Sequence, residues 1–201
     1  MIKLWNKLLQ WFSPFVRMWA GLHWPYTHKQ ITSTQYYTWR EILTPGCVIL
    51  STTYGEFSNL INPSALKHGA LYIGGKGERK YVIEALKEGV IKKCLIQHLM
   101  TKDEIVILKP KFGEQEDLEK VCRRAERFLD YKYDFIFKFN NQKFYCFELI
   151  MRCYKEIFPD RTFKKTEIVK DKYIFDYTSF VEDPDSWGLW AVSSPTLMQK
   201  L

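Results

Sequence analysis

Three side chains in this sequence have the types and positions that nucleophilic catalysis requires. Cys146 stands in KFYCFELIMRCY, at the point where a stretch of helical periodicity begins. His68 opens a predicted strand, HGALYIGG, and Glu84 lies in the middle of the next one, KYVIEAL. A thiol acts as a nucleophile when a base lies within hydrogen-bond reach and a third group orients that base. Cys146, His68 and Glu84 can supply these three roles.

The predicted position of each residue favours its role. The start of a helix stabilises a thiolate through the helix dipole and free backbone N–H groups, and the same groups can stabilise an oxyanion. Glu84 is flanked by apolar residues, and a carboxylate inside a sheet is costly unless it has a partner. Because one hairpin joins the two strands, we expect His68 and Glu84 to be cross-strand neighbours.

The other three histidines are less suited to act as the base. His23 and His28 belong to the N-terminal segment, and His98 lies in a polar stretch between two predicted strands. Each candidate also has an ordinary structural role. A cysteine between aromatic residues is often a small buried apolar residue, a histidine at a strand start is often a surface or capping residue, and a strand glutamate often pairs with a lysine. The residue pattern alone leaves both interpretations open.

Hydrophobic periodicity predicts the elements that must position these side chains. The apolar runs of the middle region predict strands over 47–53, 68–75, 80–86, 90–94 and 104–110. Helices are predicted over 33–43, over EQEDLEKVCRRAERFLD, and from Cys146 to about Ile157, before Pro159. The tail beyond Asp160 is basic and aromatic with little periodicity.

Composition bounds the class of protein. The chain has 201 residues, of which 46% are apolar, and this predicts one domain over 31–201 with an extension over 1–30. The net charge of +7 does not indicate nucleic-acid binding, because the lysines and arginines are spread out and form no recognised motif. The five cysteines are odd in number and lack C-x-x-C spacing, which argues against a structural metal and favours free thiols in a reducing, cytoplasmic compartment.

The first 24 residues differ from the rest of the chain. The segment MIKLWNKLLQWFSPFVRMWAGLHW is rich in Trp, Leu and Phe, with its polar residues on one helical stripe. Pro14 and Arg17 make it a poor transmembrane span, and no small-x-small cleavage site marks a signal peptide. Two interpretations remain: peripheral binding to an anionic membrane surface, or an amphipathic helix packed on the domain.

The order of these segments resembles a known family. LTPGCVILS, KHGALYIG, YVIEALKEGVIKKC and YKYDFIFKFNNQKFYCFELI follow one another here as in the permuted NlpC/P60 papain-like hydrolases of the YiiX/YaeF type. In that group the histidine strand and its polar partner precede the cysteine helix. The resemblance covers roughly 35–158. Two positions depart from the family pattern: Phe147 replaces the usual Ser after the nucleophile, which can narrow the site, and Cys47 replaces the Asp of the Pro-Gly-Asp turn.

The resemblance implies an α+β, circularly permuted papain-like fold, with a small, mostly antiparallel sheet packed against the cysteine helix. It implies Cys146 as nucleophile, His68 as base and Glu84 as orienting acid, with no metal or organic cofactor. The implied reaction is cleavage of a peptide-type amide, including cell-wall peptides, through a thioester intermediate. Two alternatives are a lipid acyl hydrolase or acyltransferase of the lecithin:retinol acyltransferase-like type, and a catalytically silent binding protein.

Overall fold

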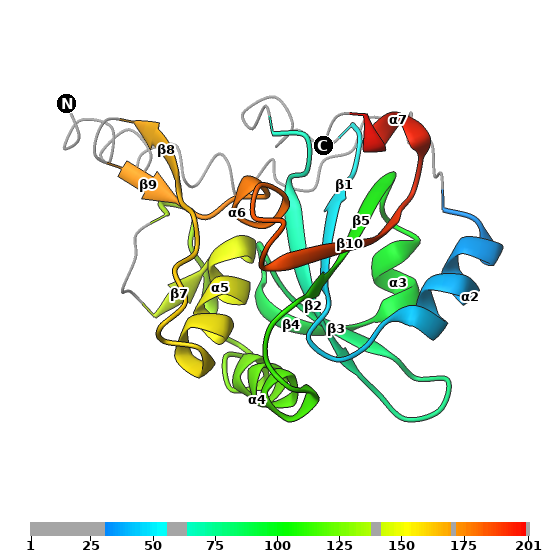
Figure 1. Cartoon of the computed structure of the whole chain (residues 1–201), viewed down its shortest axis with the longest axis horizontal. Helices are drawn as coiled ribbons and strands as arrows, with labels where there is room; N and C mark the ends of the chain where they lie inside the picture. Colours follow the sequence, from blue (N-terminus) through cyan, green and yellow to red (C-terminus); the bar gives the residue numbers. More distant parts are fainter. Residues whose placement is uncertain (1–30, 56–63, 138–141, 170–171, 200–201) are drawn as a thin grey trace.

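A six-stranded antiparallel sheet forms the centre of the protein, in the order β10-β5-β1-β2-β3-β4 (Figure 1). The computed structural model describes residues 31–55, 64–137, 142–169 and 172–199, so the predicted extension over residues 1–30 lies outside the described residues. The strands of the sheet are β1 (Val48–Thr52), β2 (His68–Gly74), β3 (Tyr81–Leu86), β4 (Gly89–Cys94), β5 (Glu104–Pro110) and β10 (Trp187–Val192).

Helices cover both faces of this sheet. One face carries α4 (Gln115–Glu126) and α5 (Cys146–Ile157), and the other carries α2 (Ser33–Ile42) and α3 (Leu95–Leu99). Neighbouring residues of a strand point to opposite faces, so β1 sends Val48 toward α4 and α5 but Ile49 toward α2 and α3. Burial on both faces explains why β1 begins with the continuous apolar run Val48, Ile49 and Leu50. The predicted α+β fold with a mostly antiparallel sheet is confirmed.

Helix α5 carries Cys146 and lies close to the sheet. Its basic Lys155 is in the last turn, as the helix dipole favours. Gly69 of β2 permits the close approach, because a Cβ atom there would lie 2.9 Å from Ile150 Cδ1. A side chain at this position would therefore push α5 away from the strand that begins with His68.

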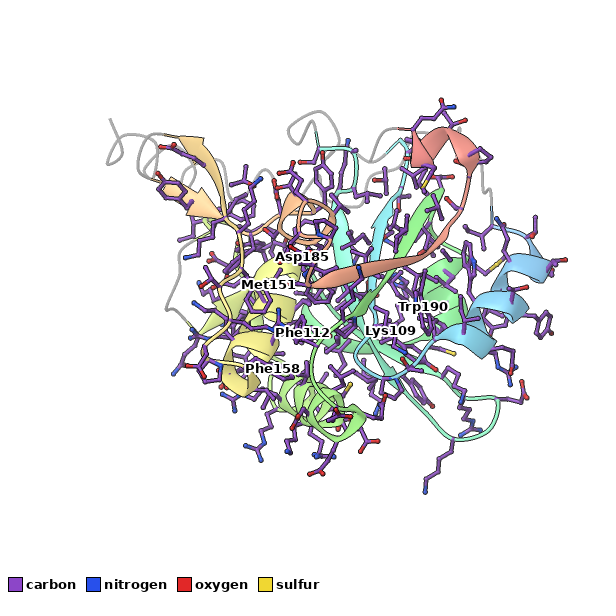
Figure 2. All side chains as sticks on the ribbon, in the orientation of Figure 1. Lys109, Phe112, Met151, Phe158, Asp185 and Trp190 are labelled. Atoms are coloured by element: carbon purple, nitrogen blue, oxygen red, sulfur yellow. The ribbon has the colours of Figure 1, made fainter. Side chains whose placement is uncertain are left out.

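The remaining elements are short, and most of them follow α5. They are β6 (Lys132–Tyr133), β7 (Lys143–Phe144), β8 (Thr166–Val169), β9 (Lys172–Ile174), α6 (Thr178–Val181) and α7 (Pro195–Met198). The sequence indicated little structure beyond Asp160, yet β10 pairs with β5 and completes the sheet. The sequence did not predict β10 as a strand, because the irregular pairing between Leu189 and Ala191 interrupts the alternation of side chains. Figure 2 shows Trp190 of β10 beside Lys109 of β5, whose ammonium lies 4.4 Å from the centroid of the indole ring.

The segment after α5 also stabilises the helix that carries the cysteine. Trp187 and Phe180 belong to the core cluster on the α4 and α5 face. The backbone N–H of Phe175 donates a 2.8 Å hydrogen bond to the hydroxyl of Tyr145, the residue directly before Cys146. The position of Cys146 therefore depends on chain segments that follow it.

Candidate active site

The hairpin of β2 and β3 brings His68 and Glu84 together. Ala70 is the register partner of Glu84, so His68 lies two residues further along the neighbouring strand on the same face. His68 Nε2 lies 2.7 Å from Glu84 Oε2. The carboxylate is fully buried, whereas 14% of the His68 side chain is exposed. The predicted contact between these two side chains is present.

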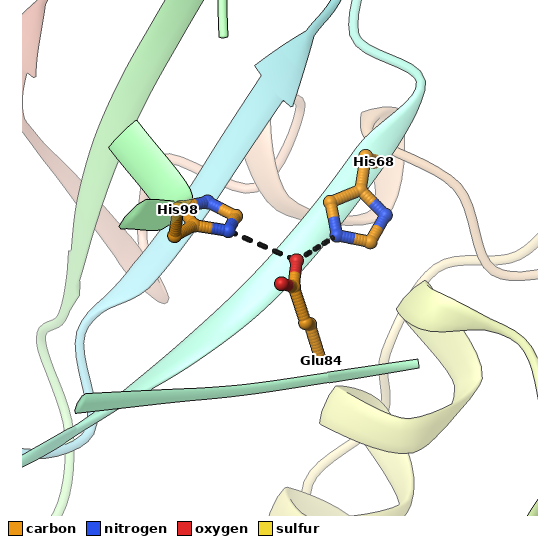
Figure 3. A group of neighbouring side chains, drawn as sticks. All are labelled: His68, Glu84 and His98. Atoms are coloured by element: carbon orange, nitrogen blue, oxygen red, sulfur yellow. Dashed lines mark hydrogen bonds and ion pairs between the residues drawn. The ribbon is translucent and has the colours of Figure 1, made fainter. Parts of the chain in front are cut away.

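A second histidine binds the same carboxylate. His98 Nδ1 lies 2.9 Å from Glu84 Oε2, and the ring is completely buried. Figure 3 shows the two imidazole rings on either side of Glu84, His68 from β2 and His98 from α3. His98 lies between two strands, as expected, but the stretch that contains it is a short helix in which the histidine is buried. Helix α3 has only five residues, too few to show a period, and its burial comes from packing against the sheet.

The two rings hold protons differently. Burial and Lys102 lower the pKa of His68, but its interactions with Cys146 and Glu84 outweigh them and raise this pKa from 6.5 to about 9. For His98, burial dominates over the attraction of Glu84 and lowers the pKa from 6.5 to about 4. Burial acts to raise the pKa of Glu84, but the two histidines hold it well below 4.5. At neutral pH the cluster is therefore a cationic His68, an anionic Glu84 and a neutral His98.

Cys146 approaches this cluster from the opposite face of the sheet. It is the first residue of α5, and the preceding Tyr145 makes no side-chain capping hydrogen bond to the helix. The thiol is close enough to the His68 ring, at the start of β2, to raise the pKa of this histidine. A helix N-terminus and an adjacent imidazolium both favour a thiolate.

Three of the other four thiols are in less reactive surroundings. None of the five cysteines forms a disulfide. Burial raises the pKa of Cys122 to about 12, and it also raises the pKa values of Cys47 and Cys153. These three cysteines therefore have the ordinary structural role of small buried apolar residues.

Two further side chains near Cys146 were missed from the sequence. Burial raises the pKa of Tyr133, and the nearby Cys146 and Asp134 raise it further. Burial likewise raises the pKa of Glu148 to about 8, with a further contribution from Asp134. Tyr133 is therefore a neutral phenol at pH 7. The only signal in the sequence was that Lys132 and Asp134 interrupt the aromatic stretch YKYDFIF. This pattern did not indicate contact with the cysteine.

The fold and this arrangement define a class: papain-like thiol enzymes in which the histidine strand precedes the cysteine helix. The chain belongs to the permuted papain-like amidase family, YaeF/YiiX, C92, whose model matches residues 42–198. The chain is therefore a cysteine amidase or peptidase by family, as predicted. No curated protein matches the sequence.

A solved structure supports the fold. The crystal structure of metalloprotein yiiX from Escherichia coli O157:H7 matches with a TM-score of 0.53 and 21% identity. The match covers 62% of this chain and 72% of that one. None of the helices within the described residues has the length and apolarity that crossing a membrane requires. The predicted membrane contact of residues 1–24 lies outside the described residues.

Within the described residues, the two histidines and the glutamate of this cluster are donor types that can hold a metal ion. The ligand atoms of His68, Glu84 and His98 all lie within 4.8 Å of one another. A tetrahedral zinc with bonds of about 2.0–2.2 Å would separate neighbouring ligand atoms by about 3.3 Å. The observed separations of 2.7 and 2.9 Å from Glu84 Oε2 are hydrogen-bond distances. Lys93 Nζ is also 3.6 Å from Glu84 Oε1, which disfavours another cation. This arrangement fits bridging protons and does not fit a bound metal.

Proposed function

We propose that the protein cleaves amides with Cys146 as nucleophile, His68 as proton carrier and Glu84 as the group that orients His68. The observation that carries the proposal is the 2.7 Å hydrogen bond between His68 Nε2 and Glu84 Oε2. This bond occupies one ring nitrogen and leaves Nδ1 for the thiol. The raised pKa of His68 supports a thiolate–imidazolium pair at neutral pH.

The reaction then takes place in two stages. The Cys146 thiolate attacks the carbonyl carbon, the C–S bond forms, and the carbonyl electrons move onto oxygen. In this proposal, backbone N–H groups at the start of α5 stabilise that oxyanion. As the C–N bond breaks, His68 gives its proton to the leaving amine, which leaves a thioester. A water then loses a proton to His68, attacks the thioester, and releases the acid and the thiolate.

The proposed substrate is a peptide-type amide, cell-wall peptides included. A lipid acyl ester is the second candidate, and it rests on the Trp- and Phe-rich stretch of residues 1–24. The same triad can serve both, because a thioester forms from an amide or an ester. The two candidates differ in what surrounds the scissile bond, so turnover of short peptide amides against acyl esters in vesicles distinguishes them.

The first prediction compares two thiols in one helix. Cys146→Ala should lower amide turnover by about 10⁶-fold, because it removes the nucleophile. Cys153→Ala is the matched control: this thiol is completely buried in α5 and its pKa is raised, so its loss should leave turnover unchanged.

Alkylation of Cys146 provides a measurement that needs no substrate. The rate is followed by mass spectrometry of the peptide that contains this residue, at several pH values. His68→Ala should slow the reaction near pH 7 by lowering the thiolate fraction. Equal alkylation rates in the wild type and in this variant would contradict the pairing of Cys146 with His68.

A further inference from the structure

We propose that His98 is a positioning residue of this site, holding the Glu84 carboxylate in the one orientation that serves His68. The inference rests on the proposed function, since it gives His98 a part in preparing the Cys146–His68 pair. In this role His98 does not contact the thiol. It acts through Glu84, and the proposed triad becomes a linear network of four side chains.

Both histidines bind the same oxygen of the carboxylate. Glu84 Oε2 lies 2.7 Å from His68 Nε2 and 2.9 Å from His98 Nδ1. The other oxygen, Oε1, has no hydrogen-bond partner among the described residues, and it forms an ion pair with Lys93, whose Nζ lies 3.6 Å away. Two rings on one oxygen fix the rotation of the carboxylate, whereas one ring alone leaves it free to turn toward Lys93.

The environment of His98 defines its tautomer. Its Nε2 atom is buried and has no hydrogen-bond partner in the part of the chain that the structure describes. A proton on Nε2 would therefore be a buried donor without an acceptor, which is more costly than an unpaired acceptor lone pair. The remaining proton must be on Nδ1, so a neutral His98 donates to Glu84. The charged groups that act on the ring are Glu84 on β3, Lys102 and His68.

Helix α3 holds this donor in place. Leu95 and Leu99 on either side of His98 are completely buried in the layer formed with α2. The backbone N–H of Leu95 donates a 2.8 Å hydrogen bond to the carbonyl of Lys80, directly before β3. The Thr101 hydroxyl donates a 2.8 Å hydrogen bond to the carbonyl of His98. The helix is thus tied to the strand that carries Glu84, as a positioning role requires.

Three variants of the full-length protein test this role. His98→Leu keeps the bulk and removes the donor. His98→Asn keeps a donor near the position of Nδ1. Leu99→Ala is the matched control, because it opens a cavity in the same helix without touching Glu84. The readout is the pH profile of Cys146 alkylation, together with the unfolding free energy of each variant.

We expect His98→Leu to slow alkylation near pH 7 by about tenfold, the effect of one hydrogen bond to a charged group. His98→Asn should recover most of that loss. Leu99→Ala should lose stability but keep the wild-type profile. An unchanged profile in His98→Leu, or equal losses in the Leu and Asn variants, would overturn the positioning role. If His68→Ala slows alkylation while His98→Leu does not, this inference fails and the proposed function stands.

Discussion

The close approach of α5 to β2 gives a quantitative prediction for Gly69→Ala. The added Cβ would lie 2.9 Å from Ile150 Cδ1 and 3.0 and 3.1 Å from two ring atoms of Phe147. Carbon atoms pack at about 3.5–4.0 Å, so the helix side chains must retreat by about 0.5–1 Å. Both neighbours are buried, Ile150 at 0% and Phe147 at 4% exposure, and have little room to move. Overpacking of this kind costs about 1–3 kcal/mol of stability.

The same displacement should affect the proposed chemistry. Gly69 follows His68 and Phe147 follows Cys146, so a retreat of α5 separates the thiol from the ring. A misplacement of about 1 Å can cost about 10²-fold in rate. We therefore expect slower alkylation of Cys146 in addition to the loss of stability.

Urea unfolding and Cys146 alkylation near pH 7 measure the two effects on the same preparation. Gly188→Ala is the matched control, because Gly188 is also in a strand and its new Cβ would meet the flexible Lys111 side chain at 3.3 Å. The reasoning would be refuted if Gly69→Ala were as stable as Gly188→Ala and alkylated at the wild-type rate. That result would mean that α5 accommodates a methyl group without moving.

Two further predictions concern the charges of the cluster. Glu84→Gln keeps a hydrogen-bonding group but removes the charge that raises the pKa of His68, so activity should fall by up to about 10⁴-fold and less than in Cys146→Ala; a loss of stability with normal specific activity would instead assign Glu84 a structural pairing with Lys93. His98 and His68 should also make the free energy of unfolding depend on pH in opposite directions. The pKa of His98 is lowered to about 4, so the folded state binds fewer protons and stability is lost as pH falls from 6.5 toward 4. The pKa of His68 is raised to about 9, so its contribution is complete below 6.5 and is lost as pH rises toward 9. Urea unfolding across pH 4–9 should show His98→Asn flattening the acid side and His68→Ala the basic side, and unchanged curves would contradict these assignments.

The sequence predicted the elements with a clear period and the contacts that a single hairpin determines. Strand β5 and helix α5 begin and end as expected, and the hairpin places His68 against Glu84. The third partner, His98, could not be predicted, because its contact depends on how a five-residue helix packs over the sheet. The same holds for β10, whose irregular pairing hides the alternation that identifies a strand. The local sequence pattern was sufficient to predict contacts between residues that are close in the sequence. It was insufficient for contacts that depend on tertiary packing.

The permuted order has a consequence for cutting the chain. His68, Glu84 and His98 all precede the end of β5 at Pro110, and Cys146 follows it. A single cut in the exposed turn at Gly113 and Glu114 would leave the imidazoles and the carboxylate on one fragment and the thiol on the other. Neither fragment would hold a complete site, but each would carry surfaces for the other, since β10 pairs with β5 and α5 packs on β2. The fold is therefore suited to fragment complementation, in which thiol reactivity reports that the two pieces have reassembled.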